Sequence, residues 1–208
     1  MLAPMAGCWI PLAIGGMVES YKKDSTHSVE GEYTGLRGKT YAILVMTDRI
    51  ILGNFPTIIG RFAAQATDRL TSENAKIGAT GAVPAAWVME FQLANPAWTS
   101  WTYDRIMDEL GVERLVVIDI TEYRLQEPGN SYLWDGVTSA RVGVVEKEAS
   151  IPGEFDFKKD VRVAFPNKKG IGPQDMSREV VQGQLDRRLL DRVTWLFYEH
   201  QEPYYPEY

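Results

Sequence analysis

Apolar and polar residues follow two different periods along this chain, and each period predicts a different kind of element. Residues 39–47 (KTYAILVMT) are apolar at odd and even positions alike, which is typical of a central strand covered on both faces. From Phe55 to Leu70 the apolar residues recur every three or four positions, which predicts an amphipathic helix capped by Asn54. Residues 85–93 fit a strand or a helix, and Pro84 favours the helix.

The second half of the chain alternates more regularly. Tyr103–Leu110 predicts a short helix, and Gly111 stands where a helix commonly ends. Residues 114–125 predict a long strand, a type II turn at 127–130 follows, and residues 132–146 return as its hairpin partner. Residues 155–165 predict an antiparallel strand with one wet face, and a last helix begins near Asp175 or Ser177.

The predicted element order is therefore β-α-(β)-α-β-β-β-α. A crossover in the first half and an antiparallel meander in the second half predict an α/β fold, a mixed sheet with helices mainly on one face. We expect the α/β domain to span 39–200, with a polar tether at 19–38 and a tail rich in Pro and Tyr at 201–208.

The N-terminal segment, residues 1–18, contains no charged side chain and holds the only cysteine. Ala6 and Gly7 precede Cys8, and a small-small-Cys sequence is what bacterial lipoprotein processing recognises when it attaches a diacylglycerol to the thiol. We therefore expect a signal and anchor segment at 1–18, with Cys8 as the site of lipid attachment. Only seven residues precede Cys8 and none is basic, so an uncleaved membrane anchor and a buried free thiol remain alternatives.

Composition excludes several classes of function. The net charge of −6 disfavours nucleic-acid binding, which needs a basic surface. One cysteine and two histidines are too few for a cysteine-rich zinc site or a multi-histidine metal centre. The sequence therefore predicts no metal and no cofactor.

The acidic residues offer little catalytic promise. Asp119 and Glu122 are expected on opposite faces of one strand, and Glu122 and Asp135 are expected as surface charges paired with arginines across the hairpin. Neither histidine lies near a candidate serine nucleophile in the sequence. We therefore predict a protein without catalytic residues.

Aromatic residues are the candidates for partner binding. Trp98 and Trp101 lie three positions apart near a predicted helix start, and the tail carries Tyr204, Tyr205 and Tyr208. Aromatic clusters that remain exposed are typical of protein-binding surfaces. The alternative is that both tryptophans pack against the core and the tail folds back on the domain.

The chain as a whole resembles a group of bacterial lipoproteins of uncharacterised function. The resemblance rests on the cysteine motif, on Gly31–Leu36 before the first predicted strand, and on the strand Leu115–Tyr123 followed by the turn Glu127–Asn130. The element order is more distantly similar to the N-terminal domain of the periplasmic Tol propeller protein and to the periplasmic domain of the curli-secretion lipoprotein. That similarity implies an anticodon-binding-domain-like fold and a role in envelope assembly.

We therefore expect a lipid-anchored protein on the periplasmic face of a bacterial membrane. Its partners would be membrane lipid, through Cys8, and either other envelope proteins or further copies of itself. The alternative is an envelope hydrolase or a protein that binds a small ligand.

Overall fold

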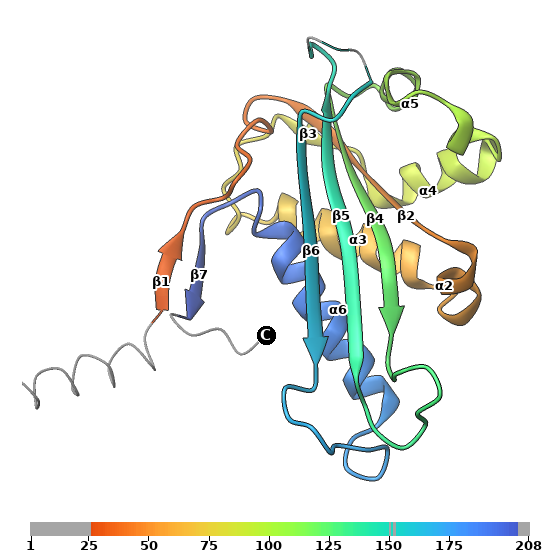
Figure 1. Ribbon diagram of the computed structural model, residues 1–208. Coiled ribbons are helices and arrows are strands. Elements are labelled where there is room, and N and C mark those ends of the chain that lie inside the picture. Colours follow the sequence, from red (N-terminus) through yellow and green to blue (C-terminus); the bar gives the residue numbers. More distant parts are fainter. Residues whose placement is uncertain (1–25, 150, 152, 204–208) are drawn as a thin grey trace, which may run out of the picture.

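A five-stranded mixed sheet forms the centre of the fold (Figure 1). The computed structural model describes residues 26–149, 151 and 153–203. The strand order is β3-β2-β4-β5-β6, in which β2 runs parallel to β3 and β4, and β4, β5 and β6 form an antiparallel meander. The strands are β2 (Thr40–Thr47), β3 (Gly81–Ala82), β4 (Arg114–Arg124), β5 (Gly136–Glu146) and β6 (Phe157–Phe165). The predicted mixed α/β fold is confirmed.

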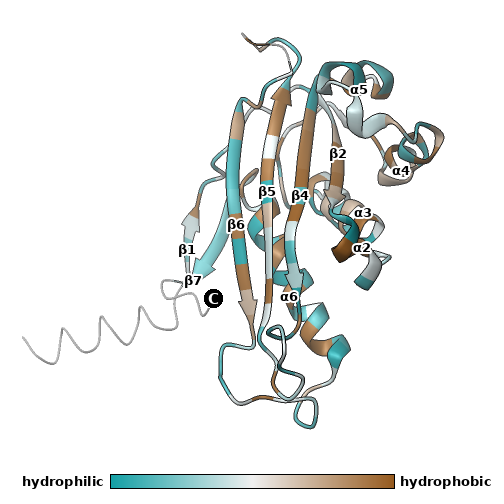
Figure 2. Ribbon diagram, turned by 45° about the vertical axis from the view of Figure 1, so that its right-hand side comes forward, coloured by the Kyte–Doolittle hydropathy of each residue, from teal (hydrophilic) through white to brown (hydrophobic). Residues whose placement is uncertain are grey.

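Two layers of helices cover the sheet, one on each face. The larger core lies between the sheet and helices α3 (Ile58–Thr71) and α6 (Arg178–Thr194). A smaller core on the opposite face packs α4 (Ala85–Ala94) and α5 (Tyr103–Leu110) over Leu44, Leu115 and Val117. The first halves of β2 and β4 are therefore buried on both faces, which explains why they are apolar at every position (Figure 2).

Local signals place the ends of α5 where the sequence predicts them, but the predicted start of the preceding long helix is wrong. Asn54, expected as its cap, is the last residue of another helix, and α3 begins at Ile58. Thr102 caps the start of α5, and Gly111 ends it in the left-handed conformation at φ 67°.

The helix that ends at Asn54 is α2 (Arg49–Asn54), a short helix between β2 and α3 that was not predicted. Asp48 caps α2 by accepting a hydrogen bond from the amide of Ile51 at 2.8 Å. Within the described residues, no helix is both long and apolar enough to cross a bilayer.

The expected tether is wrong over its described part, residues 26–38. Strand β1 (Thr26–Val29) pairs antiparallel with β7 (His200–Pro203), so both segments belong to a two-stranded ribbon beside the main sheet. Tyr33 and Leu36 then enter the larger core, where Leu36 is fully buried. These two apolar side chains explain why the polar segment folds. Residues 19–25 lie outside the described residues.

The expectation that Asp119 and Glu122 lie on opposite faces of β4 is also wrong. The register between β4 and β5 shifts between Ile120 and Glu122, which is a β-bulge. One extra residue reverses the alternation of side chains, so Glu122 joins Asp119 on the face away from α3 and α6. Beyond the bulge, Tyr123 becomes the buried residue.

Candidate functional site

A cavity of about 530 Å³ opens where β4 ends. Three separate parts of the chain build it: the end of α2, the loop from β4 to β5, and the first residue of α6. The lining residues come from segments that are far apart in the sequence. They are Asn54, Phe55, Tyr123, Arg124, Leu125, Gln126, Glu127, Gly129, Asn130, Ser131, Trp134 and Arg178. The volume lies in the range of small-molecule pockets.

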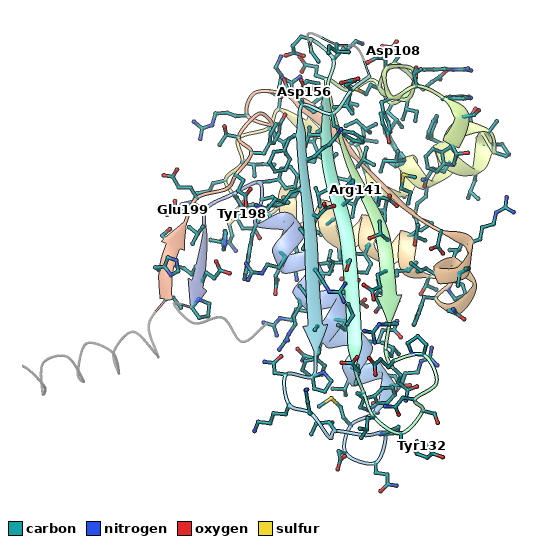
Figure 3. All side chains as sticks on the ribbon, in the orientation of Figure 1. Asp108, Tyr132, Arg141, Asp156, Tyr198 and Glu199 are labelled. Carbon is teal, nitrogen blue, oxygen red and sulfur yellow. The ribbon has the colours of Figure 1, made fainter. Side chains whose placement is uncertain are left out.

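The β4–β5 loop is held rigid by its own hydrogen bonds. The amide of Asn130 donates to the carbonyl of Glu127 at 3.0 Å, and Gly129 has φ 86°, as the predicted type II turn requires. The side-chain oxygen of Asn130 accepts from the amides of Tyr132 and Leu133. The loop wall of the cavity is therefore formed without a ligand, while Tyr132 extends outward from the loop and is 82% exposed (Figure 3).

The remaining walls of the cavity are aromatic. Trp134 is buried, and its indole N–H donates to the carbonyl of Met176 at 2.8 Å. Phe55 packs edge-on against Tyr123, with the ring centroids 4.5 Å apart. The guanidinium of Arg178 lies 5.6 Å from the centre of the Phe55 ring. The cavity thus combines aromatic side chains with polar residues of the loop and with the exposed cation of Arg178.

Behind the aromatic wall lies a buried polar network that joins β4, α3 and α6. The hydroxyl of Tyr123 donates to Oδ1 of Asp186 at 2.5 Å, and Nε of Arg61 lies 2.9 Å from Oδ2 of the same carboxylate. Burial raises the pKa of Asp186, although Tyr123 and Arg61 act in the opposite direction. Burial and the adjacent carboxylate raise the pKa of Tyr123. The network therefore fixes Tyr123, one of the residues that line the cavity.

Glu122 and Asp135 lie in arginine pairs, as predicted. Arg124 contacts Glu122 at 3.1 Å through Nε and Asp135 at 3.0 Å through Nη1. Glu122 also pairs with Arg162 of β6 at 2.7 Å. Arg141, in the middle of the exposed sheet face, pairs with Asp160 (Figure 3). These charges form a ladder across the wet face of the sheet.

The opposite end of the sheet contains a second network, centred on Arg114. This buried guanidinium makes two hydrogen bonds to Glu148, at 2.6 and 2.8 Å, and lies 3.0 Å from Glu146. Lys39, just before β2, also pairs with Glu148. Hydrogen bonds from Arg114 and Lys39 hold the pKa of Glu148 well below its usual range. The network ties the segment before β2 to the hairpin β4–β5.

The predicted partner-binding tryptophans lie together in the structure. Both are partly buried against the smaller core. The ring of Trp101 packs edge-on against Phe91 of α4 at 5.7 Å, and the guanidinium of Arg105 lies 3.6 Å from its centre. Trp98 lies beside it in a short 3-10 helix (Trp98–Ser100). The pair therefore joins α4 to α5.

The other predicted site residues, Cys8 and the three tail tyrosines Tyr204, Tyr205 and Tyr208, lie outside the described residues. His27 lies in β1, and His200 stacks on Trp195 with the rings 4.4 Å apart. Among residues 26–149, 151 and 153–203, no group of three or more His, Cys, Asp or Glu side chains could hold a metal ion.

An apolar surface that the sequence analysis missed lies on α2 and α4. Trp87 and Leu93 of α4 are 65% and 79% exposed, and Ile50 of α2 is 76% exposed. The two helices lie along the same side of the molecule, away from β6 and the ribbon (Figures 1 and 2). The available signal was α4 itself, because AAWVMEFQLA is apolar around nearly its whole circumference while one face suffices for packing.

Comparisons with known proteins add structural likenesses of low identity. No protein-family model matches the chain, and no curated protein matches its sequence. The chain is similar to the crystal structure of lipoprotein GNA1162 from Neisseria meningitidis, with 15% identity, a TM-score of 0.46, and coverage of 74% of this chain and 96% of that one.

Two further solved structures show likenesses of the same order. The PelC dodecamer from Paraburkholderia phytofirmans has 10% identity and a TM-score of 0.46 and covers 84% of this chain and 98% of its own. The hypothetical protein CT253 from Chlamydia trachomatis has 14% identity and a TM-score of 0.42, with coverage of 74% and 95%. No residue role follows from these likenesses.

Proposed function

We propose that this chain is a lipid-anchored protein of the bacterial cell envelope whose α/β domain acts by binding other proteins, without a chemical step of its own. The apolar surface of α2 and α4 is the observation that supports binding. The anchor is inferred from the sequence around Cys8.

The surface has the composition of a binding site. Trp87 is a large exposed aromatic side chain, the type that dominates the energy of protein interfaces. Leu93 follows six positions later, about 120° away around the same helix, and Ile50 adds a third exposed apolar side chain from α2. Exposed large apolar side chains are typical of interaction sites, and covering these three would remove apolar area from water.

The charges beside the patch favour a second copy of this chain as the partner. Arg49 of α2 and Glu90 of α4 are both exposed, and neither forms an ion pair with any described residue. In a two-fold symmetric dimer the same surface of both copies forms the interface, so that a residue on one side of this surface faces a residue on its other side in the second copy. The exposed apolar residues would then meet, and Arg49 of each copy would face Glu90 of the other.

Site-specific photocrosslinking in cells producing the full chain tests the proposal. A photoreactive residue at position 87 or 93 should give an adduct of twice the chain mass of 23.4 kDa. The matched control is position 180, where Val180 is an exposed apolar residue of α6 on another part of the surface. The added substitution Leu93→Glu should remove the position-87 adduct, since it places a carboxylate within the patch.

Each outcome bears on a stated part of the proposal. An adduct with a different protein would overturn self-association and identify the actual partner. Absence of any adduct from positions 87 and 93 would overturn protein binding at this surface. Intact-mass measurement of protein from native membranes tests the anchor, because an unmodified thiol at Cys8 in an uncleaved chain would contradict it.

A further inference from the structure

The cavity at the end of β4 contains one arginine, Arg178, that forms no salt bridge with a described residue, although the charge of the neighbouring Glu179 acts on it. The other arginine in the cavity wall, Arg124, already forms ion pairs with Glu122 and Asp135. Arg178 is exposed, and its guanidinium contacts the Phe55 ring but forms no ion pair among the described residues.

The wall around this cation combines polar residues of the β4–β5 loop with three aromatic side chains that are already held in place. Phe55, Tyr123 and Trp134 supply aromatic rings, and all three are held by packing or hydrogen bonds that need no ligand. The type II turn fixes the opposite wall. A preformed pocket spends little conformational entropy on binding, so a small ligand can be held by few polar contacts.

We propose that this cavity binds a carboxylate attached to an aromatic or branched apolar group. The carboxylate would accept hydrogen bonds from the guanidinium of Arg178, which matches a carboxylate in its planar geometry. The apolar group would lie against Phe55 and Trp134. The site adjoins the α2–α4 surface, since Asn54 of α2 belongs to its wall, but it assigns a ligand class that protein binding at that surface does not require.

The acidic residue in the same wall limits which ligands fit. Glu127 belongs to the turn and also forms no ion pair with a described residue. Its carboxylate repels an anion in the cavity, so replacing it with glutamine should leave the affinity of a carboxylate unchanged or increase it. A ligand that instead used Glu127 as its main contact would be a cation, and the same substitution would weaken its binding.

Titration of the full-length protein with three related probes tests the proposal. The probes are 3-phenylpropanoate, which carries the ring and the carboxylate, 2-phenylethylamine, which carries the ring and a cation, and acetate. The readout is the indole N–H resonance of Trp134 in ¹H–¹⁵N spectra, identified by its loss in Trp134→Phe. We expect 3-phenylpropanoate to shift this resonance in a saturable manner, and the other two probes to leave it in place.

Substitutions then locate the contact. Arg178→Gln should weaken 3-phenylpropanoate binding about tenfold, the size expected for losing a charge-assisted hydrogen bond. Arg187→Gln is the matched control, because Arg187 is an exposed arginine of the same helix outside the cavity wall. Equal binding of 2-phenylethylamine, unchanged affinity in Arg178→Gln, or weaker binding in Glu127→Gln would each overturn the proposal.

Two further arms separate the sources of the ligand and the two proposals. Tighter binding of the tripeptide Gly-Gly-Phe than of 3-phenylpropanoate would identify the carboxylate as a peptide terminus, and the reverse would identify it as a small free acid. The variant Leu93→Glu should titrate as the native protein does. A chain that no longer self-associates should therefore still bind 3-phenylpropanoate, so the failure of one proposal can be told apart from the failure of the other.

Discussion

Removing the carboxylate of Asp186 should destabilise the fold by about 3 kcal/mol. Asp186 is 7% exposed and holds both the hydroxyl of Tyr123 and the guanidinium of Arg61. In Asp186→Ala the hydroxyl of Tyr123, in a side chain that is 5% exposed, keeps no partner, which costs about 1–3 kcal/mol. Arg61 adds less than a fully buried charge would, because its side chain is 24% exposed and can reach water.

Two companion variants separate the charge from the hydrogen bond. Asp186→Asn keeps an oxygen that accepts from Tyr123, and burial raises the pKa of Asp186, so the charge itself is not strongly favoured. This variant should therefore cost about 1 kcal/mol. Tyr123→Phe should destabilise the native protein but have almost no effect in Asp186→Ala, because the stranded hydroxyl is then gone.

Urea denaturation followed by far-UV circular dichroism at pH 7 measures the native protein, the three single variants and the double variant. The free energy of unfolding should change through the midpoint, with the slope m unaltered. A value for Asp186→Ala within about 0.5 kcal/mol of the native protein would refute the reasoning, since that is the usual range for surface substitutions. So would an Asp186→Asn variant less stable than Asp186→Ala.

Three further predictions follow from buried or paired groups. Thr138→Val should raise the free energy of unfolding in urea by about 1 kcal/mol, because the Thr138 hydroxyl is buried and has no partner among the described residues; a loss of stability would contradict this. Glu148→Gln should make the free energy of unfolding fall less steeply as the pH is lowered below about 4.5. The pKa of Glu148 is lowered in the folded protein, so its stabilising effect is present above that pH and is lost as the pH falls through the folded-state pKa. Equal slopes of unfolding free energy against pH for the two proteins would contradict this. Leu36→Ala should cost about 2–5 kcal/mol in the same urea assay, the usual range for a buried leucine, whereas a flexible tether would show no change.

The sequence predicted those elements whose signal is local. The helix that ends at Gly111 and the turn that needs a positive φ at Gly129 each depend on one residue with a definite backbone preference. The bulge after Ile120 was missed because no glycine or proline marks it, and it appears only when β4 is paired with β5. Strand β1 was missed because three of its four residues are polar and because its pairing partner lies at the far end of the chain.

The candidate site was beyond reach for a related reason. Phe55, Trp134 and Arg178 lie on three segments that come together only in the folded sheet, and none belongs to a recognisable motif. The sequence did indicate that Glu122 and Asp135 would pair with arginines, because neighbouring strands of a hairpin are predictable from the turn between them. The exposed apolar residues of α4 could have been predicted. A helix that packs through one face needs apolar residues only on that face, and Trp87 and Leu93 are additional to them.

The β1–β7 ribbon also determines how this protein can be re-engineered. Thr26 pairs with Pro203, so the first and last described residues lie across one antiparallel ladder, about 5 Å apart between Cα atoms (Figure 1). A short linker between these two residues would therefore close the chain into a ring without displacing the sheet. New chain ends could then be opened in the exposed loop at Tyr132. This would give a circular permutant whose N- and C-termini lie in the β4–β5 loop and no longer at the ribbon.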